Sequence, residues 1–189
     1  MNKYLVDKAD TKPYKLVICY LMTLFFIAAD QVTKYLIVSK FELHDQKEII
    51  KDFFSLYYTQ NTGSAFSMFA DKTWGIYMLS AVSLLMSIVI VYAIYKSMFH
   101  KSFWLKTSLV LLLAGAIGNL IDRLRIRYVV DFLRFDFGSY TFPIFNVADI
   151  CAVVGTAILL FMIFFSNKTV DAYLQLYERK GRNKDASQD

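Results

Sequence analysis

The chain has 189 residues, of which 57% are hydrophobic and 20% are charged, and its formal net charge is +5. Soluble domains average about 45–50% apolar and about 25% charged residues, so this composition excludes a disordered chain, a coiled-coil rod and a disulfide-rich scaffold. The apolar excess falls into blocks, as in membrane proteins, and the positive charge then indicates contact with anionic lipid headgroups rather than nucleic acid.

Four segments are apolar enough to cross about 30 Å of hydrocarbon as helices, which takes about 20 residues each. The clearest runs from Trp74 to Tyr95 without a charged residue. The first segment has the basic front and apolar core of a cleaved signal peptide, but its helical pattern continues past Asp30 and three more spans follow, which favours a retained helix. The sequence therefore predicts an all-α polytopic membrane protein with spans at about 15–37, 74–95, 103–122 and 144–167.

An even number of spans places both termini on the same side of the membrane. That side carries twelve Lys and Arg residues and the other side carries nine, so the positive-inside rule places both termini in the cytoplasm. The arginines between positions 123 and 134 lie on the other side and oppose this rule, which suggests that a site there uses their charge. We expect one membrane domain over residues 1–189, with a surface helix in the polar tail at 168–189.

Two connections on the side opposite the termini are rich in aromatic and polar residues. The first, at about 40–72, has β-branched and aromatic residues followed by a turn at Asn61 and Gly63. This pattern predicts short strands, and the aromatic rings also suit the membrane interface. The second connection, at about 123–143, is centred on Val130.

Polar side chains gather near the ends of three predicted spans, at the same depth on the side opposite the termini. Residues three or four apart share one face of a helix, so the members of each group point in a common direction. Polar groups in or beside a span are costly, and they are functional candidates by default. The groups are Asp30 and Lys34 on the first span, Asn119, Asp122 and Arg123 on the third, and Asn146 and Asp149 at the start of the fourth.

Structural roles would also explain several of these groups, because the charged residues suit ion pairs or interfacial anchors and the asparagines suit hydrogen bonds between helices. Asp149 differs, since it starts a long apolar run with no cation beside it in the sequence. Asp131 is similar, since it lies between Val-Val and Phe-Leu. Two carboxyl groups in apolar surroundings favour a pair in which one stays protonated while the other acts as a base.

Other chemistries have less support. Cys19 and Cys151 lie in apolar runs where we expect inert, buried thiols. Two distant histidines, His44 and His100, cannot build a zinc site. Two other functions stay open at this point: a non-catalytic assembly factor that binds through the two rich connections, and a small ion-coupled transporter. The proton relay of such a transporter would use Asp30, Lys34, Asp122 and Asp149.

Five short motifs occur in order within about residues 14–167, and together they resemble the bacterial lipoprotein signal peptidases, the type II signal peptidases. Each motif alone is weak, but their order and their placement on the predicted spans make the resemblance specific. The motifs are DQVTK at Asp30–Lys34, NTGSAFS at Asn61–Ser67, GNLIDR at Gly118–Arg123, VVDF at Val129–Phe132 and FNVAD at Phe145–Asp149.

The resemblance implies an aspartic endopeptidase of the bacterial inner membrane. Its four helices would carry a small extracytoplasmic β-cradle after the first span and a short amphipathic element between the third and fourth. The implied substrates are diacylglyceryl-modified prolipoproteins, which the enzyme would cut just before the lipidated cysteine. The active site would face the outer side of the membrane. We expect a monomer surrounded by membrane lipids, with no nucleic-acid partner and no metal or organic cofactor.

The resemblance also implies roles for single residues. Asp131 and Asp149 would form the catalytic pair that activates a water molecule. Asp122 is a rival for the role of Asp131, although its neighbour Arg123 offers it a structural partner. The segment 133–142 matches no motif of the family. The positions that would bind substrate or support the pair are Asp30, Lys34, Asn61, Gly63, Asn119, Asp122, Arg123 and Asn146.

Overall fold

The computed structural model describes residues 13–63, 74–97 and 102–165. Four helices in these residues are long and apolar enough to cross a membrane, so the prediction of four apolar helices is confirmed. The surface helix expected in the tail lies outside the described residues. The helices are α1 (Pro13–Lys40), α2 (Gly75–Ser97), α3 (Phe103–Ile126) and α4 (Val147–Phe165).

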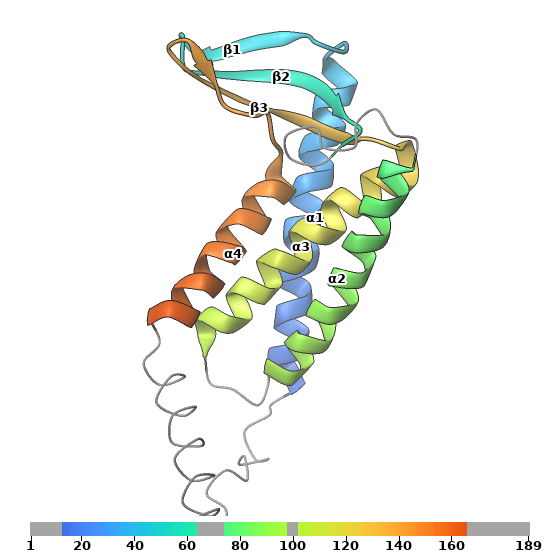
Figure 1. Cartoon of the computed structure of the whole chain (residues 1–189), viewed down its shortest axis with the longest axis vertical. Coiled ribbons are helices and arrows are strands. Elements are labelled where there is room, and N and C mark those ends of the chain that lie inside the picture. Colours follow the sequence, from blue (N-terminus) through green and yellow to red (C-terminus); the bar gives the residue numbers. More distant parts are fainter. Residues whose placement is uncertain (1–12, 64–73, 98–101, 166–189) are drawn as a thin grey trace, which may run out of the picture.

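Helix α3 packs against each of the other three helices and occupies the middle of the bundle (Figure 1). Glycines allow it to approach α4 closely, because a Cβ atom on Gly115 would lie 2.5 Å from the carbonyl oxygen of Ala148. A Cβ atom on Gly155 of α4 would likewise lie 2.9 Å from the carbonyl oxygen of Ser108. This close packing brings the last turns of α3 against the first turns of α4.

Helix α4 begins at Val147, three residues later than predicted. Phe145 is extended instead, because its backbone N–H and carbonyl oxygen hydrogen-bond with Leu133 of a neighbouring strand. Asn146 then caps the helix: its Oδ1 accepts the N–H of Asp149 at 3.0 Å, and its own N–H donates to Oδ2 of Asp149 at 3.1 Å. These reciprocal bonds form a capping box, which satisfies two of the unpaired donors at the helix start.

A four-stranded antiparallel sheet lies at one end of the bundle (Figure 1). The short strands predicted in the first rich connection are present there. The second connection contributes a long strand rather than a separate amphipathic element, because its residues alternate in character and its backbone pairs with the first connection. The strands, in their order across the sheet, are β1 (Gln46–Ile50), β2 (Phe54–Asn61), β3 (Val129–Phe137) and β4 (Tyr140–Thr141).

The sheet is fixed to the bundle by a small apolar core. Val130 and Phe132 of β3 are buried with Ile37, near the end of α1, and with Tyr58 of β2. Burying an aliphatic or aromatic side chain of this size contributes about 1.5–3 kcal/mol. The core therefore holds the start of β3 firmly against the helix ends. Elsewhere in the bundle, Cys19 and Cys151 are buried free thiols, as predicted.

Candidate active site

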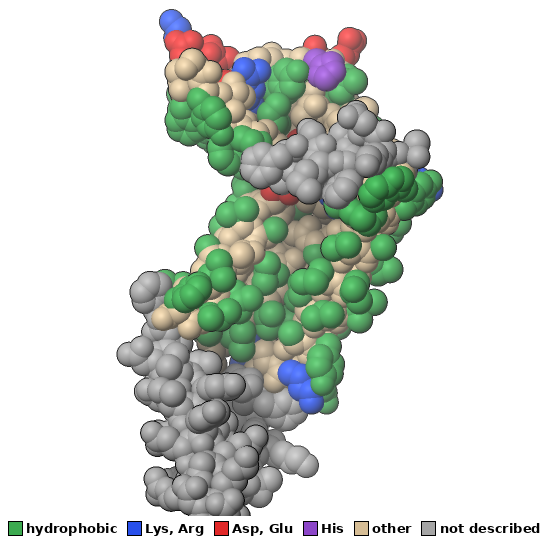
Figure 2. All heavy atoms as spheres, viewed as in Figure 1, with side chains coloured by type: hydrophobic (Ala, Val, Ile, Leu, Met, Phe, Trp, Pro, Cys, Tyr) green, Lys and Arg blue, Asp and Glu red, His purple; other side chains and the backbone are tan. Residues whose placement is uncertain are grey.

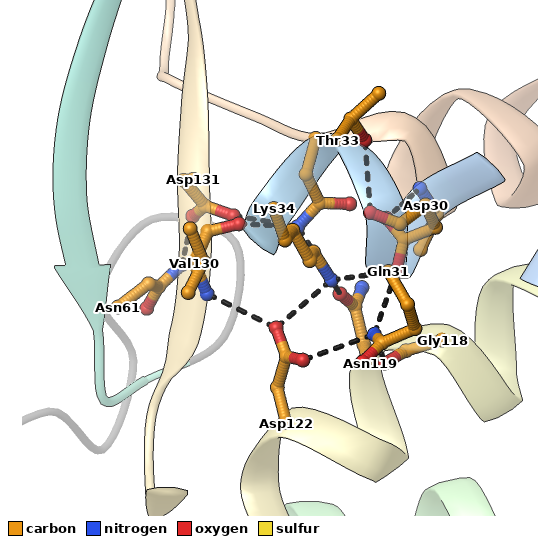
Figure 3. Close-up of polar contacts among 12 residues, drawn as sticks. Asp30, Gln31, Thr33, Lys34, Asn61, Gly118, Asn119, Asp122, Val130 and Asp131 are labelled. Carbon is orange, nitrogen blue, oxygen red and sulfur yellow. Dashed lines mark hydrogen bonds and ion pairs between the residues drawn. The ribbon is translucent and has the colours of Figure 1, made fainter. Parts of the chain in front are cut away.

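A buried lysine connects two helices at the sheet end of the bundle. The Nζ atom of Lys34 lies 2.9 Å from Oδ2 of Asp30 and 3.0 Å from Oδ2 of Asp122, and it donates to Oδ1 of Asn119 at 3.0 Å (Figure 3). The three N–H groups of the ammonium thus have three acceptors. Removing one partner of such a buried ion pair costs about 3–5 kcal/mol, so this cluster holds α1 and α3 in one register.

Gln31 belongs to the same cluster, although the sequence reasoning did not single it out. Its Nε2 atom lies within hydrogen-bond distance of Oδ1 of Asp122 at 3.0 Å, of Oδ2 of Asp30 at 3.1 Å and of the carbonyl oxygen of Gly118 at 3.2 Å (Figure 3). The available signal was its spacing of three from Lys34, which places both side chains on one helix face. Gln31 lies within the DQVTK motif, but the sequence analysis gave it no role of its own.

Asp122 has a different partner from the one expected. Its ion pair is with Lys34 of α1 and not with the adjacent Arg123. The same Oδ2 atom accepts the backbone N–H of Val130 at 3.2 Å, one residue before Asp131 (Figure 3). Asp122 therefore ties the start of β3 to the helix cluster.

Arg123 lies on the neighbouring face of α3. Its Nη1 atom makes a long hydrogen bond of 3.4 Å to the hydroxyl of Ser83 on α2. Its Nε atom is buried and has no hydrogen-bond partner among the described residues. The guanidinium also interacts electrostatically with Asp149, Asp131 and Asp122. It is a cation beside the carboxyl groups, and its buried Nε donor is not used by the part of the chain that the structure describes.

Asp131 is held by two side-chain amides. Nδ2 of Asn61 donates to its Oδ2 at 2.9 Å, and Nδ2 of Asn146 donates to its Oδ1 at 2.7 Å. Only 2% of the residue is exposed. Burial and the negative charge of Asp149 raise the pKa of Asp131 to about 7, although the two amide donors and Lys34 partly oppose this shift. Near neutral pH, this carboxyl group therefore exchanges a proton readily.

Gly63 acts through its backbone. Its N–H donates to Oδ1 of Asn61 at 3.0 Å, which turns the amide nitrogen of Asn61 toward Asp131. The residues 64–67 of this motif lie outside the described part of the chain. The described part still shows how the turn after β2 orients a donor onto β3.

Asp149 is held by the start of its own helix and by α3. Besides the capping box, its Oδ1 accepts a hydrogen bond from Nδ2 of Asn119 at 2.8 Å. Lys34 bonds the oxygen of the same amide, so the nitrogen of Asn119 must face Asp149. The charge cluster on α1 and α3 thereby orients a hydrogen-bond donor toward a carboxyl group on α4.

Asn146 is the residue that joins the two carboxyl groups. It is fully buried, its Oδ1 caps the helix that carries Asp149, and its Nδ2 donates to Asp131. The same Nδ2 lies 3.1 Å from Oδ1 of Asn119 and 3.3 Å from the carbonyl oxygen of Val130. All ten site residues predicted from the sequence thus belong to, or lie beside, one connected cluster.

The cluster has the chemistry of an acid–base site. It contains two carboxyl groups. In the described part of the chain, their neighbours are mainly amide and ammonium donors and one guanidinium group. In the described part of the chain, no three His, Cys, Asp or Glu side chains are grouped so that they could hold a metal ion. A carboxyl pair of this kind can take a proton from water with one member and give a proton with the other.

Comparison with known proteins identifies relatives of this chain. The family model for signal peptidase (SPase) II matches residues 22–165. The chain is 38% identical over 143 residues to a lipoprotein signal peptidase of Psychromonas ingrahamii, covering 75% of this chain and 82% of that protein. It is 40% identical over 153 residues to the lipoprotein signal peptidase of Enterococcus faecalis, covering 81% of this chain and 91% of that protein.

A solved bacterial membrane enzyme has the same fold, with a TM-score of 0.68 and 28% identity over 78% of this chain and 93% of that one. A second has a TM-score of 0.65 and 29% identity over 82% and 90% of the two chains. These likenesses support a membrane peptidase over the transporter and the assembly factor. The chain, a bacterial membrane protein, therefore belongs to the signal peptidase II family, as its five motifs predicted.

Proposed function

We propose that this chain removes the signal peptide from diacylglyceryl-modified prolipoproteins by hydrolysis just before the lipidated cysteine, with Asp131 and Asp149 as the catalytic pair. One observation carries the proposal. Asn146 donates to Asp131 and caps the helix whose first turn carries Asp149, so two carboxyl groups from separate segments are held by one side chain. The names of the relatives support lipoprotein precursors as the substrate.

The position of the pair suits a substrate anchored in lipid. Asp149 lies in the first turn of α4, where this apolar helix begins, and Asp131 lies on the adjoining strand. Acyl chains dissolved in the membrane beside the helices would fix the depth of the modified cysteine. The peptide bond just before that cysteine would then lie at the level of the two carboxyl groups.

In the proposed mechanism, Asp131 holds the proton near neutral pH, in keeping with its pKa of about 7. Asp149 accepts a proton from a water molecule, whose oxygen attacks the carbonyl carbon of the scissile peptide. Asp131 donates its proton to the carbonyl oxygen as the tetrahedral intermediate forms. When this intermediate collapses, Asp131 recovers the proton and Asp149 protonates the leaving amine. General acid–base catalysis of this kind supplies about 10²–10⁴-fold, and positioning supplies much of the rest.

Arg123 is the proposed contact for the substrate backbone. Its buried Nε atom has no partner among the described residues, and a peptide carbonyl oxygen beside the catalytic pair would satisfy it. Asn61 and Asn119 keep the carboxyl groups in place, since each gives its amide nitrogen to one of them. Lys34, Asp30 and Asp122 in turn hold these supports. No metal or organic cofactor takes part in this mechanism.

A cleavage assay tests the proposal. Purified protein in detergent is given a diacylglyceryl-modified prolipoprotein and its unmodified twin, and cleavage is followed by gel shift. Wild type is expected to cut only the lipidated form, whereas Asp131→Asn and Asp149→Asn are expected to lose at least about 10²-fold in rate. Asp136→Asn is the matched control, because Asp136 is on the same strand but bonds Arg134. Wild-type turnover in either active-site variant would remove that residue from the pair.

We also propose that both termini are cytoplasmic and that the catalytic pair faces the outer side of the bacterial inner membrane. The charge bias of the connections supports this orientation. A reporter that is active only in the cytoplasm, fused after Asp189, is expected to be active in cells. A reporter active only outside the cytoplasm, inserted at Asp52 in the β1–β2 turn, is expected to be active as well. The reverse result for both fusions would invert the proposed orientation.

A further inference from the structure

Strand β3 and the hairpin that follows it separate their side chains by face. The register pairs Phe54 with Phe135 and Phe137 with Tyr140, so these rings lie on one face of the sheet. Directly opposed residues share a face and successive residues alternate between faces. Phe142 joins the same face, because its N–H donates to the carbonyl oxygen of Phe135. The part of the sheet that holds these residues is therefore lined by aromatic rings on this face.

The other face of the same strands is polar. Arg134 and Asp136 form an ion pair at 3.0 Å, and Thr141 donates to Asp136. The guanidinium of Arg134 also bonds Gln46 of β1. Two faces of one hairpin thus differ completely in chemistry, although nothing in the catalytic mechanism requires this difference.

Four rings near the tip of the sheet remain uncovered, and we call them the aromatic patch. Their exposed fractions are 40% for Phe53, 55% for Phe137, 58% for Tyr140 and 44% for Phe142. Phe53 packs its ring edge against Phe137 at 5.6 Å, so the patch is continuous. Since a fully covered ring buries about 150–250 Å², these exposed fractions leave on the order of 400 Å² of apolar surface open. A patch of that size on a protein surface usually marks an interaction site.

The patch is turned toward the membrane-spanning helices. The tip of the sheet projects sideways beyond the start of α4 (Figure 1). Hydrophobic side chains gather on the underside of this overhang, and charged side chains gather along its upper edge (Figure 2). The space beneath the overhang adjoins the start of α4, whose side chains Ile150 and Val153 are exposed and would face lipid.

We propose that the aromatic patch binds the lipid bilayer directly, with its rings in the interfacial layer at the start of the acyl chains. Phe, Tyr and Trp rings favour this layer because their apolar bodies enter the hydrocarbon while polar groups stay in the headgroup region. Arg134 and Asp136 on the opposite face remain in water. The patch continues the lipid-facing surface of α4, so the occupant is lipid rather than a second protein. This contact would fix the tilt of the sheet over the membrane and does not depend on catalysis.

Site-directed fluorescence tests this contact. Trp74 and Trp104 are replaced by Phe, and one tryptophan is then introduced as Phe137→Trp, Phe142→Trp or, as matched control, Thr141→Trp. Thr141 is adjacent to the patch in sequence but lies on the polar face. Each protein is placed in phosphatidylcholine vesicles with and without bromine near the start of the acyl chains. The two patch positions are expected to be quenched at least about threefold more strongly than the control, with the reverse order for aqueous acrylamide.

Three outcomes would overturn the proposal. Equal quenching by brominated lipid on both faces would show that the patch does not enter the bilayer. Acrylamide protection that depends on protein concentration would assign the patch to contact between copies of the chain. Protection that appears only after a lipidated peptide is added would assign it to substrate. Positions 137, 141 and 142 are all exposed, so unchanged gel-filtration volumes are expected and confirm that the variants fold.

Discussion

The amide of Asn146 shows how much one side chain can organise at this site. It accepts from the backbone of α4, donates to Asp131 and contacts the carbonyl oxygen of Val130. An aspartate in its place would keep the acceptor that caps the helix but would lose both N–H donors. An alanine would lose both functions. The two replacements therefore separate the structural role of the residue from its role toward the carboxyl pair.

We expect Asn146→Ala to destabilise the protein by about 1–2 kcal/mol through the lost cap and to lower the cleavage rate. Asn146→Asp is expected to keep more of the stability yet lose more activity, because it places a third carboxylate beside Asp131. Thermal unfolding in detergent and the gel-shift assay measure the two effects. An Asn146→Asp variant with wild-type activity would contradict the role given to the amide donors.

The raised pKa of Asp131 predicts a dependence of stability on pH. The carboxyl titrates near 7 in the folded protein and near 3.9 in an unfolded chain, so the folded state binds more protons between these values. The free energy of unfolding should then fall by about 1 kcal/mol per pH unit as the pH rises from roughly 4 to 7. Above pH 7 this group should cause no further loss. In Asp131→Asn this contribution should vanish. The same dependence of unfolding free energy on pH in wild type and Asp131→Asn would contradict the raised pKa. The rate of cleavage by wild type should also fall above pH 7, because Asp131 then loses the proton that it donates.

Sequence reasoning predicted which residues cluster better than it predicted their partners. Asp131 and Asp149 stood out because carboxyl groups in apolar runs are costly, and that cost can be read from the sequence. The partner of Asp122 was predicted wrongly, since adjacent residues on a helix point in different directions and the nearest cation in sequence is not the nearest in space. Lys34 reaches Asp122 from another helix, and only the packing of α1 on α3 makes that contact.

Among the elements, the junction of α3 and α4 controls the geometry of the pair. A Cβ atom on Gly115 would meet the carbonyl oxygen of Ala148 at 2.5 Å and the backbone nitrogen of Ala152 at 2.9 Å. These are backbone atoms of a helix, so a neighbouring side chain cannot turn aside to relieve the clash. Any larger residue must push the two helices apart and thereby separate Asn119 from Asp149.

We expect Gly115→Val to destabilise the protein by about 1–3 kcal/mol, the usual cost of overpacking, and to reduce cleavage at least tenfold. Gly138→Asn is the control, because a Cβ atom there meets nothing within 4 Å and asparagine tolerates its φ of +64°. Thermal midpoints and cleavage rates are compared for both. The packing argument fails if Gly115→Val is as stable and active as the control.

The predictability of the elements differed between helices and strands. Spans of about 20 apolar residues are set by membrane thickness, so length and hydropathy located all four helices. The start of α4 was placed too early because Phe145 continues its apolar run, although it pairs with Leu133 in space. Strand β3 was missed because its partner, β2, lies about 70 residues earlier in the chain, and such distant pairing leaves only a weak local signal.

At the scale of the molecule, the family could be recognised from five motifs because each motif is a point where separate segments meet. The resemblance carried no information on segment 133–142, which matches no motif. That segment forms the end of β3 and the hairpin with the aromatic patch. The segment that matches no family motif is thus the one whose strand, hairpin and exposed rings could be described only from the structure.

The hydrogen bond from the backbone N–H of Ala148 to Oδ1 of Asp30, at 2.9 Å, joins residues 118 positions apart. During synthesis, the first helix enters the membrane long before the last one exists. Until α4 arrives, this carboxylate oxygen lacks its protein donor and Asp149 is absent. Under the proposed mechanism, a chain that lacks α4 also lacks one member of the catalytic pair, so a chain truncated before α4 is expected to be inactive. Insertion of the last helix would then be the step that completes the proposed active site.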